Sequence, residues 1–447
     1  MQYNLTKGPI TLNILRFALP LMCGNLLQQT YNIADTWIVS RFLGANALAA
    51  VGSSYALMIF LTSIILGLCM GSGAAIAMQY GSGQFDKLRR CIFMSFSLIA
   101  AAALALNIGV YLGLGHILHW LCVPIEVQPL MSVYLKIIFA GIMATFLYNY
   151  FANLLNAVGN SVTPLYFLAV AALGNIGLDL LFVLVFKWGV GGAAWATVAA
   201  QFLAGVGIAI YTLNKFPHLR PQRADMCWDK ADLASIVNLS VMTSVQQSIM
   251  NFGILLVQGL VNSFGTVVMA AFAAAVKIDS FAYMPVQDFG NAFSTYVAQN
   301  YGAKQPERIR LGIRSAILTS AIFCFIISVL VFTFAQPLMQ IFIDSQEKAI
   351  ITVGIQYLRI EGACYIGIGI LFLLYGYYRA VNMPSMSVIL TVASLGTRVV
   401  LAYALSAIPA IGVVGIWLSV PIGWALADII GIAYYFMRSR KQLPAAT

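Results

Sequence analysis

Charged residues are scarce in this sequence of 447 residues. Asp, Glu, Lys and Arg together make up 9%, whereas an average soluble chain has about 25%. Apolar residues make up 61%, and apolar runs longer than about 18 residues, each long enough to span a bilayer, recur along the chain. The runs leave no stretch that reads as a soluble domain. The composition therefore excludes a soluble enzyme or binding domain and predicts an all-α integral membrane protein.

The sequence also lacks the motifs of ATP hydrolysis and of catalysis within membranes. No G-x-x-x-x-G-K-[ST] phosphate loop is present, so any transport by this chain would be passive or driven by an ion gradient. No H-E-x-x-H or D-D-x-x-D cluster is present, which argues against a membrane-embedded enzyme. The seven cysteines are scattered and the three histidines lie in or near predicted loops. We therefore expect that the protein is not an enzyme and that its cysteines form no disulfide set. We also expect no cofactor other than a coupling ion.

Turn and charge signals divide the apolar sequence into twelve predicted spans. The breaks fall at glycine, proline or charged stretches, such as residues 159–164 and the polar segment 214–233, because these residues interrupt membrane helices. The predicted spans cover residues 13–40, 48–80, 90–115, 130–156, 162–187, 190–213, 234–262, 267–301, 311–335, 350–381, 384–407 and 410–437.

The chain contains two copies of one ancestral unit. FLGANALAA at 42–50 resembles SFGTVVMAA, and MQYGSGQFDKLRR at 78–90 resembles QNYGAKQPERIRL, each 221 residues further on. VYLKI at 133–137 resembles QYLRI, and NAVGN at 156–160 resembles RAVNM, each 223 residues further on. A near-constant offset over half the chain indicates a duplication, which is typical of secondary transporters with a binding site between two halves.

The number of spans in each copy sets how the copies are related. Six spans return the chain to its starting side, so the two copies have the same orientation and are related by an axis along the membrane normal. We predict two pseudo-symmetric six-helix bundles facing each other across a cavity. Residues 1–213 form the N-terminal lobe, residues 214–233 a cytoplasmic linker and residues 234–447 the C-terminal lobe.

Lys and Arg residues orient the predicted spans. With the N-terminus inside, the inside segments hold seventeen of them, and the outside loops hold three, which are Arg41, Lys187 and Lys348. Positive charge accumulates on the cytoplasmic side of membrane proteins, so both termini are predicted to be cytoplasmic. The net charge of +10 is then a topology signal spread over separate loops, and no nucleic-acid partner is expected.

Two carboxylates lie inside predicted spans of the first half, and the matched positions of the second half are apolar. Asp35 lies in the first span and Asp179 in the fifth, and their counterparts are Leu256 and Leu401. An intramembrane carboxylate is costly and indicates a functional site by default. The N-terminal half therefore has two interior carboxylates that the C-terminal half lacks.

Further oxygen-bearing side chains accompany Asp179. Asn175 lies one helical turn before it, and Thr197 in the next span adds a hydroxyl group. Carboxylate, amide and hydroxyl oxygens together suit a small cation or a proton. The alternative is that Asn175 and Asp179 only join helices through hydrogen bonds.

Two long segments carry a family resemblance. LPLMCGNLLQQTYNIADTWIVSRFLGANALAAVG, which begins at Leu19, resembles the first-span signature of the multidrug and toxic compound extrusion (MATE) transporters. KIDSFAYMPVQDFGNAFSTYVAQNYGA, which begins at Lys277, resembles its second-half counterpart, and the paired loops QYGSGQ and NYGAKQ are specific. The resemblance, which covers nearly the whole chain, implies a two-lobe antiporter in the inner membrane of a prokaryote. It would export small organic compounds, in particular cationic amphipathic drugs, against inward Na⁺ or H⁺ flow, and we expect it to be a monomer.

The resemblance also implies roles for individual residues. The family's N-lobe cation site falls on Asp35, Asn175, Asp179 and Thr197, and its bent first helix falls on Pro20, which lacks an amide donor. One branch of the family has acidic residues in the seventh helix, where this chain has glutamines, so we expect no cation site in the C-terminal lobe. Further polar candidates for the cavity are Gln28, Tyr31, Gln246, Gln247, Lys277 and Asp288.

Cationic residues near or within the predicted spans leave a flippase for lipid-linked oligosaccharides as the main alternative, because such a protein would line its cavity with cations. The candidates are Lys136, Lys277, Arg359 and Arg398. We expect Lys277 to pair with an acid on another helix, and Lys136 and Arg359 to extend to the interface. A major facilitator transporter is the weaker alternative, because the loop after the second span matches that family's motif only loosely.

Overall fold

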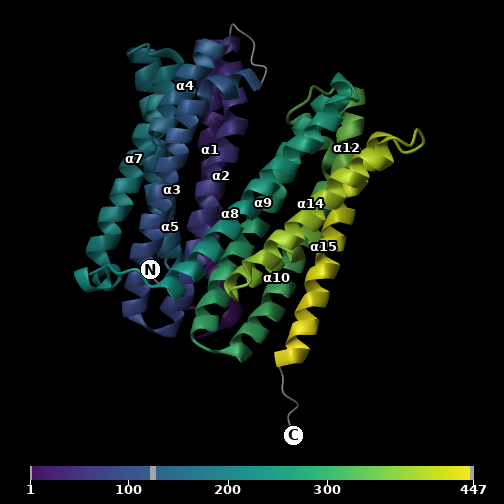
Figure 1. Cartoon of the computed structure of the whole chain (residues 1–447). Helices are drawn as coiled ribbons and strands as arrows, with labels where there is room; N and C mark the ends of the chain where they lie inside the picture. Colours follow the sequence, from purple (N-terminus) through teal and green to yellow (C-terminus); the bar gives the residue numbers. More distant parts are fainter. Residues whose placement is uncertain (1–2, 121–126, 443–447) are drawn as a thin grey trace. The chain divides into compact units, whose positions relative to one another are not determined.

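The computed structural model describes residues 3–120 and 127–442, and no strand occurs among them. The chain ends, predicted to be cytoplasmic, lie outside these residues at 1–2 and 443–447. The helices of Figure 1 are α1 (Ile10–Leu43), α2 (Ala45–Ser82), α3 (Phe85–Trp120), α4 (Gln128–Ala140), α5 (Ile142–Ala157), α6 (Val162–Asp179), the π-helix η1 (Leu180–Val185), α7 (Gly189–Lys215), the short η2 (Pro217–Leu219) and η3 (Arg223–Asp225), α8 (Lys230–Asn262), α9 (Thr266–Gly302), α10 (Pro306–Thr333), α11 (Ala335–Gln340), α12 (Lys348–Gly362), α13 (Tyr365–Ala380), α14 (Pro384–Ser406) and α15 (Val413–Gln442).

The structure supplies a helix or a bent helix pair for each of the twelve predicted spans. Ten helices of the described chain are long and apolar enough to cross a membrane, and the pairs α4–α5 and α12–α13 supply two more spans, bent by 45° and 51°. The bends fall at Gly141 and at residues 363–364, which are equivalent positions of the two repeats. At Gly141 a Cβ would lie 2.6 Å from a methyl group of Val198. The spans predicted at residues 130–156 and 350–381 are therefore both bent.

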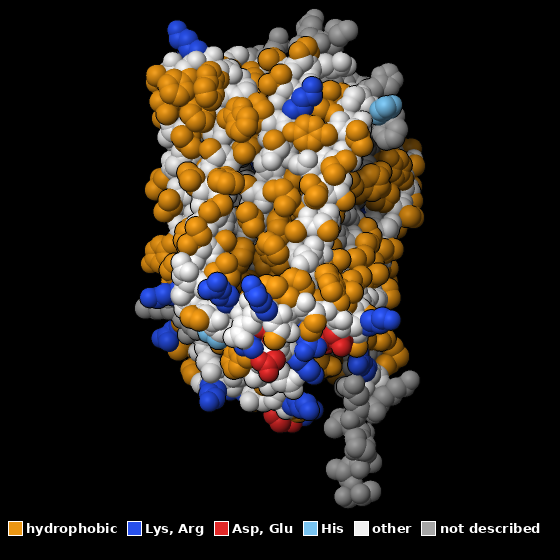
Figure 2. Space-filling model, turned by 60° about the vertical axis from the view of Figure 1, so that its left-hand side comes forward, with side chains coloured by type: hydrophobic (Ala, Val, Ile, Leu, Met, Phe, Trp, Pro, Cys, Tyr) orange, Lys and Arg blue, Asp and Glu red, His pale blue; other side chains and the backbone are white. Residues whose placement is uncertain are grey.

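The outer faces of the helices expose large apolar side chains. Tyr166, Val170 and Leu173 on α6 are 68%, 71% and 71% exposed, and their spacing of three or four residues places them on one helix face. On the face drawn in Figure 2, hydrophobic side chains cover the helix walls, and many of the charged side chains gather at one end. Such apolar walls suit a lipid environment, in which helices satisfy their own backbone hydrogen bonds.

The described chain forms two compact units, and two helices are divided between them. One unit contains residues 19–244 and the other contains residues 245–301 and 305–442 together with residues 6–18. The first part of α1 thus belongs to the second unit, and the first part of α8 belongs to the first unit. The division of α1 falls directly before Pro20, although α1 continues as one helix through this proline.

Two glycines allow α8 to approach α2 closely within the first unit. A Cβ on Gly67 would lie 2.4 Å from the Cα of Ser244, and a Cβ on Gly71 would lie 2.3 Å from the carbonyl oxygen of Leu239. The Ser244 hydroxyl donates a hydrogen bond of 3.0 Å to the carbonyl oxygen of Ile64. Glycines four residues apart remove the side chains that would separate two helix backbones. This contact holds the beginning of α8 against the N-terminal half.

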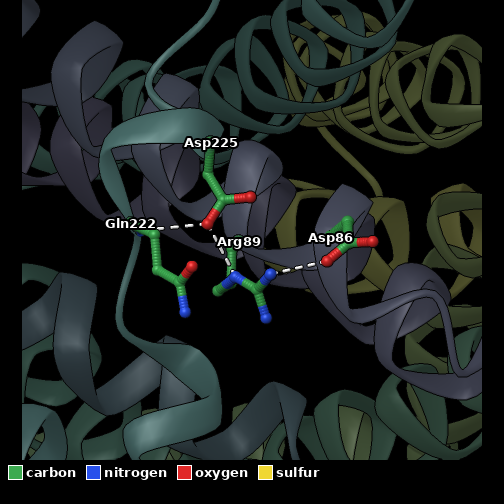
Figure 3. Close-up of polar contacts among 4 residues, drawn as sticks. All are labelled: Asp86, Arg89, Gln222 and Asp225. Carbon is green, nitrogen blue, oxygen red and sulfur yellow. Dashed lines mark hydrogen bonds and ion pairs between the residues drawn. The ribbon is translucent and has the colours of Figure 1, made fainter.

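The linker between the repeats is anchored to α3 (Figure 3). The Arg89 guanidinium donates from Nε to Asp225 Oδ2 at 2.6 Å and from Nη2 to Asp86 Oδ1 at 2.5 Å. The backbone N–H of Gln222 donates to the same oxygen of Asp225 at 2.9 Å. The Trp228 ring packs edge-on against Phe93, with centroids 5.8 Å apart. These contacts tie the linker to the N-terminal half.

The first prediction concerns the glycine contact. We expect Gly71→Leu to lower the free energy of unfolding by about 1–3 kcal/mol, because the side chain would have to displace the α8 backbone. The matched control is Gly109→Leu on α3, since Gly109 is exposed and no atom lies within 4 Å of its Cβ position. Thermal unfolding in detergent measures both variants, and equal midpoints would contradict the close contact.

The second prediction concerns the pH dependence of the linker anchor. Burial alone would raise the pKa of Asp225, but the hydrogen bonds from Arg89 and Gln222 and the nearby arginine charges outweigh it and lower this pKa. Because the pKa of Asp225 is lower in the folded state than in the unfolded state, ionised Asp225 stabilises the folded linker. This stabilisation is complete above the pKa of the unfolded state, about 3.9, and is lost as the pH falls through the pKa of the folded state. We expect Asp225→Asn to lack this stabilisation at neutral pH.

Hydrogen–deuterium exchange of residues 216–229, corrected for the intrinsic rate at each pH, measures this effect. Asp225→Asn should exchange faster than the parent at neutral pH, and the difference should shrink below about pH 4. Asp344→Asn, which changes an exposed acid in a distant loop, should behave as the parent does. Equal exchange in the parent and Asp225→Asn at neutral pH would show that the anchor contributes nothing.

Candidate cation or proton site

The four residues predicted to hold a cation lie together in the first unit. Asp35 comes from α1, Asn175 and Asp179 from α6, and Thr197 from α7. The Asn175 amide donates a hydrogen bond of 3.4 Å to the Thr197 hydroxyl. The carboxyl groups of Asp35 and Asp179 are close enough to interact electrostatically. Three helices thus bring two carboxyl groups, one amide and one hydroxyl group to one place.

This group presents more acceptors than the protein satisfies. Asp179 is 0% and Asn175 2% exposed. Four buried oxygens accept no hydrogen bond from the described residues: Oδ1 of Asp35, Oδ1 of Asn175 and both carboxyl oxygens of Asp179. Two ionised carboxylates can only accept, so a proton on one of them would turn their contact into a hydrogen bond. A small cation that prefers oxygen ligands, such as Na⁺, would instead bind the same oxygens, and the residues present fit either.

The backbone changes its winding directly after Asp179. This residue ends α6, and residues 180–185 continue as the π-helix η1. A π-helical turn is rare and occurs frequently at functional sites, because the wider turn re-aims side chains. No pattern in the sequence indicated this segment, which was expected to be part of an ordinary span.

A tyrosine that sequence analysis did not single out belongs to the same group. Tyr134 on α4 is 4% exposed and interacts electrostatically with Asp35 and Asp179. Its repeat counterpart is Tyr357 on α12, which interacts with Asp279 and Glu361 in the second unit. The matching segments VYLKI and QYLRI contain both tyrosines, so the repeat comparison could have found them. Each half places the same tyrosine beside a pair of carboxyl groups.

The second unit holds a buried charge cluster of its own. Asp279 on α9 and Glu361 on α12 are 5% and 1% exposed, and both interact with Arg398 on α14. The Tyr365 hydroxyl donates a hydrogen bond of 2.6 Å to Asp279. The counterparts of Asp35 and Asp179, which are Leu256 and Leu401, gave no sign of this cluster, because its acids occupy positions without acidic counterparts in the first half. Interior carboxylates are therefore not confined to the N-terminal half.

The other polar candidates are divided between the units. Gln28 and Tyr31 lie on α1, where their side chains are hydrogen bonded to each other. Gln246 on α8 is 2% exposed, and its Oε1 accepts no hydrogen bond from the described residues. The backbone oxygen of neighbouring Gln247 accepts a hydrogen bond of 3.1 Å from the Asn251 amide.

Lys277 and Asp288 lie on α9 in the second unit, where Asp288 is buried. Lys277 is exposed, and its ammonium group lies over the Phe342 ring, 6.0 Å from the centroid. The described residues place no carboxylate within 4 Å of its Nζ atom. The expectation that Lys277 pairs with an acid on another helix is therefore wrong for the described residues, because its exposed side chain lies over an aromatic ring instead.

Comparison with known sequences identifies the family. The sequence matches MatE over residues 20–181 and 242–404, one match in each repeat. It is 28% identical to the probable multidrug resistance protein YpnP of Bacillus subtilis, over 97% of this chain and 96% of the relative. It is 24% identical to the FAD transporter of Shewanella oneidensis, over 98% of this chain and 96% of the relative.

Solved structures share the fold. A multidrug resistance MATE family transporter in an outward-facing conformation superposes with a TM-score of 0.92, at 23% identity and 98% coverage of both chains. A transporter of the MOP superfamily from Pyrococcus furiosus superposes with a TM-score of 0.91, at 22% identity and 97% coverage of both chains. The family match covers more than half of the chain in two blocks that follow the repeats. This multi-pass membrane protein belongs to the MatE family of transporters.

Proposed function

We propose that this chain is a secondary antiporter that exports small organic compounds in exchange for Na⁺ or H⁺ bound at Asp35 and Asp179. The group of four buried oxygens without a donor carries the proposal, because unpaired carboxyl groups inside a membrane are costly unless a proton or cation neutralises them. The probable multidrug resistance proteins and multidrug export proteins among the relatives support export of drugs. We place the transporter in the inner membrane of a prokaryote, as a monomer with both termini in the cytoplasm.

Coupling requires that the ion and the drug favour different states of the protein. A ligand shifts a conformational equilibrium only by its difference in affinity for the two states. Without a proton or cation, two carboxylates at one place repel each other and attract a cationic drug. With a proton or cation bound, the repulsion and the attraction both weaken, so ion and drug compete. Alternating access of the two lobes then exchanges one for the other.

The flippase alternative loses support from the positions of the cations. Arg398 interacts with Asp279 and Glu361, so its charge is compensated within the protein. Arg359 lies over the Phe332 ring, 5.3 Å from the centroid. Lys136, like Lys277, is exposed. Two of the four cations that motivated this alternative, Arg398 and Arg359, thus have partners within the second unit.

The third prediction tests the two carboxyl groups. We expect Asp35→Asn and Asp179→Asn each to reduce drug-dependent ion movement by about 100-fold or more, since loss of a charged ligand is worth several kcal/mol. The proteins should remain folded, because the amide keeps the shape of the carboxyl group. Proteoliposomes with separately imposed Na⁺ and H⁺ gradients provide the measurement and identify the coupling ion. Asp344→Asn is the control, and full coupling in either buried variant would refute the assignment.

The fourth prediction tests Pro20 as a hinge in α1. The two units divide α1 directly before this residue, and proline removes a backbone hydrogen bond from the helix. If bending at Pro20 links the ion site to drug release, Pro20→Ala should retain drug binding while turnover falls about tenfold, or ~1.4 kcal/mol in the rate-limiting barrier. Turnover equal to that of the parent would show that Pro20 is only a static kink. Drug affinity unchanged by both saturating Na⁺ and low pH would contradict the competition itself.

A further inference from the structure

One buried carboxyl group of the second unit belongs to neither cluster described above. Asp428 lies near the middle of the membrane-spanning part of α15, which covers residues 413–438. Asp428 is only 7% exposed, and its Oδ1 atom accepts no hydrogen bond from the described residues. The positions equivalent to Asp428 in the first repeat are Gly205, Val206 and Gly207, so this acid is peculiar to the second half.

The groups around Asp428 do not compensate a negative charge. On α13, Tyr375 interacts electrostatically with it. On α14, Arg398 has its Cβ 3.6 Å from the Cβ position of Gly423, which lies more than a turn away along α15. On α12, Tyr357 packs on Trp417, about three turns away. The described residues form no ion pair with Asp428. A charged carboxylate here would cost several kcal/mol, so the neutral, protonated form is favoured.

The space beside Asp428 limits what it can bind. A Cβ on Gly367 of α13 would lie 3.7 Å from Asp428 Oδ2 and 3.5 Å from the Cβ of Trp424. A methyl group at this position would therefore lie in ordinary van der Waals contact with the carboxyl group. Among the described residues no second carboxyl group interacts with Asp428 as Asp35 does with Asp179. A proton, which a single carboxyl group can bind, is therefore the ligand that suits Asp428.

Gly367 lies against the Asp428 carboxyl group at a partly exposed position of α13. Asp428 is nearly enclosed, whereas Gly367 is partly exposed, and the absence of a side chain there leaves the carboxyl group thinly covered. We propose that Asp428 is a proton-binding residue of the C-terminal half that exchanges its proton past Gly367. This inference extends the proposed antiport, in which it would add a proton carrier distant in the sequence from Asp35 and Asp179.

Labelling with dicyclohexylcarbodiimide tests the proposal without drug or gradient. A protonated carboxyl group gives its proton to a carbodiimide nitrogen, and the resulting carboxylate oxygen bonds to the central carbon; rearrangement then yields a stable N-acylurea. Peptide mass spectrometry of the full-length protein in liposomes would follow the adduct on Asp428 from about pH 6 to pH 9. We expect labelling to fall about tenfold per pH unit above the titration midpoint.

Two variants sharpen the test. The Asp428→Asn variant should lose the adduct at position 428 and keep the adducts on its other carboxyl groups. Gly367→Ala, which makes only ordinary contacts, should slow labelling of Asp428 by about tenfold, equal to ~1.4 kcal/mol of barrier, while labelling of Asp35 stays unchanged. The proposal would be overturned if labelling of Asp428 did not depend on pH, or if Asp35 were labelled while Asp428 was not. It would also be overturned if Gly367→Ala left the labelling rate of Asp428 unchanged. Drug export that ignores every ion gradient would overturn the proposed antiport instead, and would leave these labelling results as they are.

Discussion

The cost of an unpaired carboxyl group inside a membrane is the constraint on which this structure depends. Asp35 and Asp179 lie on neighbouring helices of the first unit, and no basic side chain of the described residues forms an ion pair with either. Water cannot solvate them there as it does at a surface, so their charge must be removed by a proton or matched by a cation. The surrounding amide, hydroxyl and tyrosine groups can orient such a ligand, but they carry no compensating charge. The proposed binding of a proton or small cation rests on this shortage of compensating charge.

The two repeats share a scaffold and differ in chemistry. Both bend the corresponding span, at Gly141 and at residues 363–364, and both place the matched tyrosine, Tyr134 or Tyr357, beside two acids. The acids themselves come from different positions of the repeat, and in the second half Arg398 joins them. An internal guanidinium compensates part of the charge that a bound ion would otherwise have to supply. Duplication therefore preserved the backbone geometry while the ligand preference of each half could change.

The close helix contacts explain why the compact units do not follow the repeat boundary. Gly67 and Gly71 let the beginning of α8 lie directly on α2, so this part of the second repeat belongs to the first unit. The first part of α1 belongs to the second unit in the same way. The division of α1 lies next to Pro20, where one backbone hydrogen bond is missing. Asp35 therefore lies on a helix that is shared by both units.

The sequence by itself determined the class, the span count, the duplication and the positions of Asp35, Asn175, Asp179 and Thr197. Hydrophobic run length and repeat offset are local or periodic signals, and rare polar residues stand out against an apolar background. Only the tertiary structure decided that Tyr134 joins the first acids, that Asp279, Glu361 and Arg398 form one cluster, and that Lys277 lies over the Phe342 ring. These outcomes depend on the rotation of each helix about its axis, because a turn of about 100° per residue decides which side chains meet.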